Sequence, residues 1–456
     1  MKITFIADTH HYSKTLGTTG KAYELRSGSD QKCLAETGEI IDSAFKQIAE
    51  SDTDAVFILG DLSNNGERAS HVEFREKLYD LKKSKPVFVI TATHDWCCDG
   101  NPRRFDGDTV SNDVEVMRSD ELPEFYKDFG PAQAIDSFIT KIGTICYTVQ
   151  LGNKLRVLCL NDDKNENDHA GFTEDCWQWI ERQIENAKCD GCMIIGAEHH
   201  LLMPHISPLI AIGSVCVADR DHVASRFADT GLKYMFVGHS HMQSTAKFTS
   251  EKGNTITEVN VGSLCGYPAP IVTVTVNDND TITYDVDHLK SVILNGREIE
   301  AMPFLAKHAA NVINRVLECK TKEDFSERLS ALQLSGKKLS AYWVIARPIL
   351  HKLDTMLAYD VYKLLKAFGL AKYVPKAAVQ RYHYKPLKDF IDEIFLSVLD
   401  GALDTTEKGS DYYELVVGVI RGLSSLKRDA DFTEELIKAF DNALTGGEIN
   451  NQHATI

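Results

Sequence analysis

The sequence predicts an α/β protein followed by an all-α domain, on the basis of three observations. In residues 1–290, short apolar runs with strand character alternate with segments whose apolar residues recur at helical spacing. The later half of this part turns to short strands, expected at 144–150, 154–160, 255–261, 270–276 and 281–287. Beyond residue 295 the apolar residues recur at helical spacing instead. Helices outside and two packed sheets inside fit this order for the first part.

The helices of the first part are indicated by apolar faces and capping residues. Residues 37–50 place five apolar residues on one helical face: Ile40, Ile41, Ala44, Phe45 and Ile48. Ser70 and Glu73 form a capping-box pattern, which predicts that a helix begins there. Thr173 and Asp221 are placed to cap two further helices.

The change of pattern near residue 295 divides the chain. We expect a first domain at residues 1–290, a helical C-terminal domain at 295–445 and a flexible tail at 446–456. The helical domain carries apolar stripes, for example Leu387, Phe390, Ile391 and Ile394. These stripes favour an internal core over a membrane face, because the segments can pack on one another.

Composition narrows the classes of partner. The chain has 456 residues and a formal charge of −16, which disfavours a long nucleic-acid groove. No apolar run approaches the ~18 residues of a membrane-spanning helix. The strand expected at 2–6 leaves no room for a signal peptide, and eleven cysteines without a regular framework are typical of reduced thiols. We therefore expect a cytoplasmic protein, and the sequence indicates no particular oligomeric state.

Five polar clusters, each following an expected strand, carry the chemistry. They are Asp8-Thr9-His10, Gly60-Asp61, Thr93-His94-Asp95, His199-His200 and Gly238-His239-Ser240-His241. Residues i and i+2 of an extended chain point to the same side, so Asp8 and His10 can face one ion, and His239 and His241 repeat that spacing. A lone Asp is often a helix cap and a lone His a core residue, but five such clusters in order indicate a two-metal site.

This ordered set resembles the calcineurin-like metallophosphoesterases, whose pattern is D-x-H, GD, G-N-H-D, a later His and G-H-x-H. The resemblance covers residues 1 to about 290 and departs in two places, where Ala92 and Thr93 replace the Gly and Asn. It implies a four-layer αββα sandwich with the helical domain added. It also implies a metal-dependent phosphohydrolase that cleaves a small phosphomonoester or phosphodiester with a hydroxide activated by two metals.

The resemblance also implies the ligands of two divalent or trivalent ions. The first ion would take Asp8, His10, Asp61 and His241, and the second Asp61, His199, His239 and, at the family's Asn position, Thr93. Mixed imidazole and carboxylate ligands suit Mn, Fe or Zn better than Mg or Ca. A threonine hydroxyl is a weaker ligand than an amide oxygen, so the second ion would bind loosely, use water instead or be absent.

The remaining site residues have roles outside the ligand set. By the resemblance, His94 reaches the phosphate or the leaving oxygen, either as a proton donor whose tautomer Asp95 fixes or as a cation that stabilises phosphate charge. Asn64 would supply a hydrogen bond behind the ligands. His200 is expected in the core or at the rim, with substrate contact as the alternative. Loops at 15–31, 96–119 and 204–217 would rim the pocket.

The alternative to an enzyme is a non-catalytic protein with the same fold. A non-catalytic interaction scaffold would use the weakened second site for structure and the helical domain to bind a partner. Such a protein would be expected to have lost several ligands. This chain keeps all of the residues expected to bind metal or act on the substrate, and only the Asn position has changed. Their presence favours an enzyme.

Overall fold

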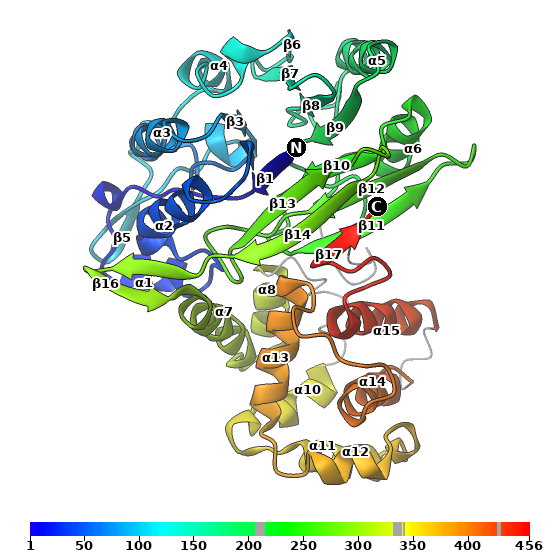
Figure 1. The fold of residues 1–456 in the computed structure, drawn as a ribbon. Coiled ribbons are helices and arrows are strands. Elements are labelled where there is room, and N and C mark those ends of the chain that lie inside the picture. The colour runs from blue at the N-terminus through cyan, green and yellow to red at the C-terminus, as the bar shows by residue number, and fades with distance from the viewer. Residues whose placement is uncertain (206–214, 332–339, 341–342, 426–429) are drawn as a thin grey trace. The chain divides into compact units, whose positions relative to one another are not determined.

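The computed structural model describes residues 1–205, 215–331, 340, 343–425 and 430–456 (Figure 1). The chain forms two compact units. The first comprises Met1–Met203, Ser214–His308 and His453–Ile456, and the second contains Ala309–Gln452. The middle of the rim loop expected at 204–217 lies outside the described residues.

A six-stranded mixed sheet holds the first three polar clusters. β1 runs parallel to β2, and β2 parallel to β3, so the carboxyl ends of these strands share one edge. In order across the sheet, its strands are β17 (His453–Thr455), β14 (Ile282–His288), β13 (Pro270–Val276), β1 (Lys2–Ile6), β2 (Ala55–Leu59) and β3 (Val87–Ile90).

A seven-stranded sheet holds the last two clusters. Its centre is parallel, since β9 pairs in parallel with both β8 and β10. In order, its strands are β11 (Ser244–Thr249), β12 (Thr255–Asn260), β10 (Tyr234–Val237), β9 (Met193–Ala197), β8 (Leu155–Cys159), β7 (Ile145–Leu151) and β6 (Asp136–Ile139).

The two sheets pack face to face through alternating strand residues. In β1, Ile3 and Phe5 enter the core between the sheets, whereas Ile6 faces the opposite side. Phe5 stacks on Phe236 of β10 with ring centroids 4.1 Å apart. This contact ties the two sheets together directly beneath the strand ends that carry Asp8 and Gly238.

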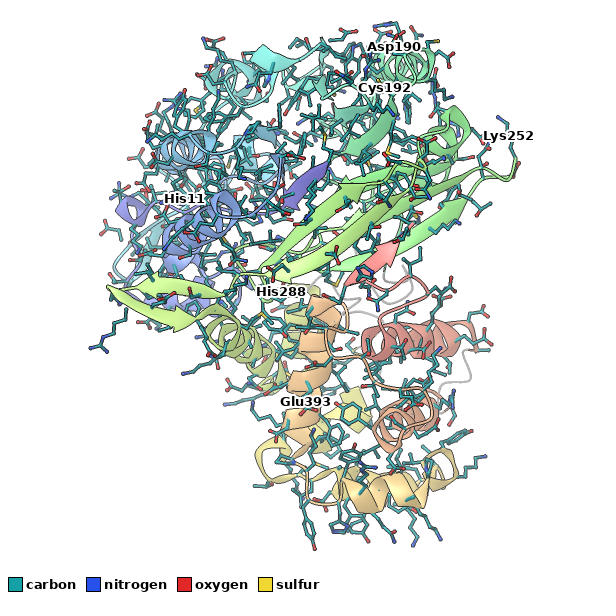
Figure 2. All side chains as sticks on the ribbon, in the orientation of Figure 1. His11, Asp190, Cys192, Lys252, His288 and Glu393 are labelled. Carbon is teal, nitrogen blue, oxygen red and sulfur yellow. The ribbon has the colours of Figure 1, made fainter. Side chains whose placement is uncertain are left out.

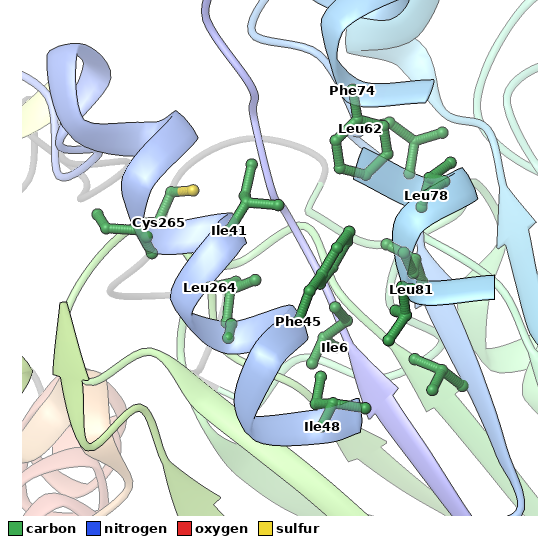
Figure 3. Packing of buried hydrophobic residues seen from close by; sticks show 14 of the residues in the cluster. Ile6, Ile41, Phe45, Ile48, Leu62, Phe74, Leu78, Leu81, Leu264 and Cys265 are labelled. Carbon is green, nitrogen blue, oxygen red and sulfur yellow. The ribbon is translucent and has the colours of Figure 1, made fainter. Parts of the chain in front are cut away.

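Helices cover the outer face of each sheet. Figure 3 shows Phe45 of α2 (Thr37–Ala49) and Leu78 of α3 (Arg68–Lys82) packed over Ile6 of the first sheet. On the second sheet, Trp177 of α5 (Glu174–Cys189) and Phe227 of α6 (Arg220–Thr230) share one core. The predicted αββα sandwich is therefore confirmed.

Smaller elements complete the first unit. They are α1 (Lys21–Ser27), β4 (Arg104–Asp106), β5 (Thr109–Ser111), α4 (Leu122–Phe125), the hairpin β15 (Ser291–Leu294) and β16 (Arg297–Glu300), and the start of α7 (Ala301–Leu317). The first unit extends past the expected boundary at residue 290, because Val292, Ala301 and Leu305 pack into the core beneath α2 and α3.

The second unit is helical in its described part, as predicted. Its apolar stripes form a core that includes Phe390, Leu415 and Val416. Its helices are α8 (Lys322–Ala331), α10 (Trp343–Leu350), α11 (Ala358–Ala367), α12 (Lys376–Arg381), α13 (Leu387–Asp400), α14 (Asp411–Ser424) and α15 (Ala430–Thr445). None of the described helices combines the length and the hydropathy that a bilayer span requires.

Three local expectations differ from the structure. Helix α6 begins at Arg220 after Asp219, so Asp221 lies in its first turn and does not cap it. The tail expected at 446–456 ends in β17, which pairs antiparallel with β14 as an edge strand, so backbone hydrogen bonds order its last residues. Helix α3 begins at Arg68, before the capping box expected at Ser70, and Glu73 accepts a hydrogen bond from Ser13. The cap at Thr173 is confirmed: its hydroxyl accepts from the Cys176 N–H.

Candidate metal centre

Five strand ends converge on one place in the first unit. The backbone N–H of His10 donates to Asp61 O at 2.8 Å, which joins the turns after β1 and β2. The Gly238 N–H donates to His199 O at 3.1 Å and joins the turns after β10 and β9. The two sheets meet where the His239 N–H donates to Asp8 Oδ2 at 2.9 Å. Both sheets therefore have to be in place before the site exists.

Five of the six His and Asp residues predicted to bind metal lie in left-handed backbone. Asp8, His10, Asp61, His239 and His241 have φ between 39° and 68°, a region that residues other than glycine seldom adopt. The extended geometry expected for Asp8 with His10 and for His239 with His241 is therefore wrong, since β1 and β10 end before them. The side chains share a side because the chain turns sharply. Such strain typically concentrates at functional sites.

Two glycines permit the close approach of these turns. A Cβ on Gly60, whose φ is +83°, would lie 2.5 Å from His199 Nδ1. A Cβ on Gly238 would lie 2.7 Å from Asp8 Oδ2. Both contacts are shorter than van der Waals packing allows, so both motifs require glycine for space, and Gly60 is required for its backbone conformation as well.

The first group consists of Asp8, His10 and His241. His10 Nε2 lies 3.0 Å from His241 Nε2, and Asp8 Oδ1 lies 3.7 and 3.5 Å from these two nitrogens. Asp8 and His10 are fully buried. Asp8 Oδ1 has no hydrogen-bond partner in the structure, although its other oxygen is held by the His239 N–H.

The second group consists of Asp61, His199 and His239. His199 Nε2 lies 3.1 Å from Asp61 Oδ2 and 3.2 Å from His239 Nδ1. His199 Nδ1 lies 2.7 Å from the Leu59 carbonyl and donates to it, so Nε2 is the nitrogen that faces the group.

Asp61 lies between the two groups. Its Oδ1 accepts from the His94 N–H at 3.0 Å, and its Oδ2 lies 3.1 Å from His199 Nε2 and 3.7 Å from His10 Nε2. One carboxylate oxygen therefore faces a nitrogen ligand of each group. The structure brings the predicted His and Asp residues together in these two groups, and their binding of two ions with Asp61 shared remains a prediction.

The protonation states of His10, His239 and Asp61 suit cation binding. Burial lowers the pKa of His10 and of His239 well below the usual histidine value, and neighbouring positive groups act in the same direction. Burial alone would raise the pKa of Asp61, but the charges of His199 and His94 hold it well below the usual range. Neutral imidazole and ionised carboxylate are the forms that bind metals. Burial would lower the pKa of His199 as well, but the charge of Asp61 raises it well above the usual histidine value, so His199 would release a proton when a metal binds. Together with the unpartnered Asp8 Oδ1, this donor set fits two cations.

The surroundings of His94 correct one expectation. His94 Nδ1 lies 2.7 Å from the Asn64 carbonyl and donates to it. The Asp95 carboxylate instead accepts from the N–H groups of Ser63 and Ala92 at 2.9 and 2.8 Å, and so closes the turn that carries His94. The role expected of Asp95 in fixing the tautomer therefore belongs to the Asn64 backbone. The Asn64 side chain donates to Glu67.

Thr93 begins a short 3₁₀ helix, Thr93–Trp96, directly after Ala92. It is half-buried, and its hydroxyl forms no hydrogen bond with the described residues. Thr93 as a metal ligand remains a prediction.

Sequence reasoning missed a third buried group, formed by Asp162, Asp163 and His200. Asp162 accepts from both Nδ1 and the backbone N–H of His200, at 3.0 and 2.9 Å. This holds the His200 ring 4.5 Å from the ring of His239. The signal was available, because Asp162 and Asp163 follow the strand predicted at 154–160 just as the five clusters follow theirs.

His11 is next to His10 in the sequence but belongs to neither of the two groups. His11 is labelled in Figure 2, and its Nε2 lies 3.0 Å from Glu73 of α3. It therefore fastens the turn after β1 to that helix.

An αββα sandwich with two adjoining His/Asp groups at its strand ends defines a protein of the metallophosphoesterase class. The family model for calcineurin-like phosphoesterases matches residues 1–243, which is more than half of the chain. The chain therefore belongs to this family and is a metal-dependent phosphoesterase. No curated protein matches it significantly.

Solved structures with a related fold include three phosphatases or nucleotidases. A dimetal phosphatase from Danio rerio is 12% identical with a TM-score of 0.43, over 66% of this chain and 98% of that one. A purple acid phosphatase from yellow lupin seeds is 14% identical with a TM-score of 0.39, over 66% and 52%. A putative 5'-nucleotidase from Staphylococcus aureus is 10% identical with a TM-score of 0.36, over 66% and 55%.

Replacing Asp61 with Asn should remove most of the bound metal. The amide keeps the shape but loses the negative charge that faces both groups, so both ions should be weakened. Metal content after dialysis, measured by mass spectrometry, should fall from about two ions to fewer than one per chain. Asp190→Asn, on an exposed salt bridge, is the control. Unchanged metal content in Asp61→Asn would contradict the shared role.

Replacing Thr93 with Asn should tighten the weaker ion. An amide oxygen reaches further than a hydroxyl and is the better neutral ligand. Calorimetric titration of the metal-free protein should show two unequal steps, and the variant should strengthen only the second. Two equally tight steps, unchanged in the variant, would show that another group already fills the position.

Proposed function

We propose that the protein hydrolyses a small phosphate ester at the paired His/Asp groups, with water as the nucleophile and two ions bound. The observation that carries this proposal is the position of Asp61 Oδ2, which faces His10 of one group and His199 of the other at 3.7 and 3.1 Å. A carboxylate in that position suits a pair of ions better than a single one, since it can serve both.

Two cations held by these residues would acidify a water molecule and stabilise the charge of an in-line displacement. Mn, Fe or Zn is the proposed pair, because imidazole and carboxylate ligands suit these borderline ions. The protein itself fixes the ligands. Backbone N–H groups hold one oxygen of Asp8 and one of Asp61, so that only the other oxygen of each is free to face a cation.

His94 is the proposed contact to the substrate. Its Nδ1 is committed to the Asn64 carbonyl, which leaves Nε2 as the atom that can meet a phosphate or a leaving oxygen. Burial lowers the pKa of His94, while the charge of Asp61 opposes this shift. A bound phosphate adds further negative charge and favours the protonated ring, which could then donate through Nε2.

The proposal is tested by removing and restoring the metals. Protein treated with a chelator should hydrolyse neither nitrophenyl phosphate nor bis-nitrophenyl phosphate, and addition of Mn, Fe or Zn should restore turnover on at least one of them. A panel with cyclic nucleotides would then separate monoesterase from diesterase activity. Equal hydrolysis by the chelated protein would contradict the proposal, and no turnover with any metal would favour the scaffold alternative.

Replacing His94 with Ala should slow the hydrolysis of alkyl phosphates by about 10²-fold or more, because their alkoxide leaving group needs a proton. The loss should be much smaller on nitrophenyl phosphate, whose leaving group departs without one. The comparison is made through kcat on the two substrates at equal metal content. The same loss on both would assign His94 to charge stabilisation instead.

A further inference from the structure

Lys32 is a buried cation whose hydrogen-bonding capacity is unused. Only 5% of its side chain is exposed. Its nearest carboxylate oxygen, Asp30 Oδ2, lies 3.6 Å from Nζ, which is longer than a hydrogen bond. Among the residues described, Nζ donates to no acceptor. An ammonium group carries three donors, and leaving them unmatched in a buried position is costly.

Asp30 is shared between Lys32 and a second cation, Arg26. The same Asp30 Oδ2 lies 2.7 Å from Arg26 Nη2, and Asp30 Oδ1 accepts from the backbone N–H of Lys32 at 3.1 Å. Asp30 therefore faces two cations with one negative charge, and it lies closer to Arg26 than to Lys32.

The chain holds Lys32 beside the first ligand turn. The Cys33 N–H donates to Cys265 O at 2.9 Å, and Cys265 Sγ donates to the carbonyl of Thr9, which lies between Asp8 and His10. On the other side, His308 Nε2 lies 2.9 Å from Asp30 O. The segment is thus fixed at both ends, and its position does not depend on the Lys32 side chain.

The charge of Lys32 reaches the site. After burial, it is the largest influence that lowers the pKa of His10, and it lowers that of His94 as well. Together with the hydrogen bonds that fasten Cys33 to Cys265 and Cys265 to Thr9, this places the Lys32 segment beside the first group. Two bound cations would repel the Lys32 charge, so a buried ammonium here is favourable only when an anion lies within reach.

We propose that Lys32 is a substrate-binding residue whose ammonium donates to a non-bridging oxygen of the phosphoryl group. This rests on the proposed function and narrows it to a substrate class. A phosphomonoester carries close to two negative charges at neutral pH, whereas a diester carries one. A third cation beside the metals therefore favours monoesters.

Direct binding of inorganic phosphate tests the proposal without requiring turnover. Metal-loaded protein is titrated with phosphate in a calorimeter, and Lys32→Met is compared with Lys83→Met, which removes an exposed lysine that pairs with Asp80. Lys32→Met should bind phosphate roughly 10- to 100-fold more weakly, as expected for the loss of a hydrogen bond to a charged group. Lys83→Met should match the native protein, and Lys32→Arg should retain most of the affinity.

Turnover gives the second readout. The ratio of kcat/KM for a monoester to that for a diester should fall in Lys32→Met, with metal content unchanged. Phosphate affinity equal to native would overturn the role of Lys32 even if the protein is an active phosphoesterase. Weakened phosphate binding in a protein that hydrolyses no ester would uphold the contact and contradict the proposed function instead.

Lys32→Gln is a second neutral variant, which keeps the test decisive if Lys32→Met does not fold. If both neutral variants unfold or lose their metals, or if the native metal-loaded protein binds no phosphate, Lys32 is a structural residue and the proposal is wrong.

Discussion

The site depends on the Asp61 carboxylate, one oxygen of which is held by the His94 N–H while the other faces both His/Asp groups. Such a group is stable only if its charge is balanced. In the protein alone the surrounding histidines provide that balance and keep the pKa of Asp61 low. The need to bring these groups to one carboxylate explains the left-handed backbone at five ligand residues and the two glycines that leave room for it.

The sandwich architecture serves the same requirement. Asp8, His10 and Asp61 come from the first sheet, and His199, His239 and His241 from the second. The contact between Asp8 and the His239 N–H joins the two sheets at the site, and Phe5 on Phe236 joins them below it. A substitution that shifts one sheet against the other should therefore weaken metal binding without touching a ligand. This is why buried core residues between the sheets belong to the functional description of the protein.

Much of this could be predicted from the sequence, because strand ends leave a clear signal. An apolar run followed by polar residues located the six His and Asp residues of the first two groups, but not the third group at Asp162, Asp163 and His200. The predictions that failed concern backbone turns and long-range strand pairing, which that signal does not encode. The extended backbone expected at Asp8 and His10 is overridden by a turn, and the terminal strand β17 depends on an edge of β14 more than 160 residues earlier in the chain. Lys32 carries no motif at all, since only the folded loop shows that it is buried near the ligands.

The central claim is that Asp61 is shared by two ions, and anomalous diffraction from crystals of metal-loaded protein tests it most directly. The account predicts two peaks on either side of Asp61 Oδ2, about 3.5–4 Å apart, one beside Asp8, His10 and His241 and the other beside His199 and His239. A single peak, or a peak at Asp162, Asp163 and His200 with none beside Asp61, would contradict it.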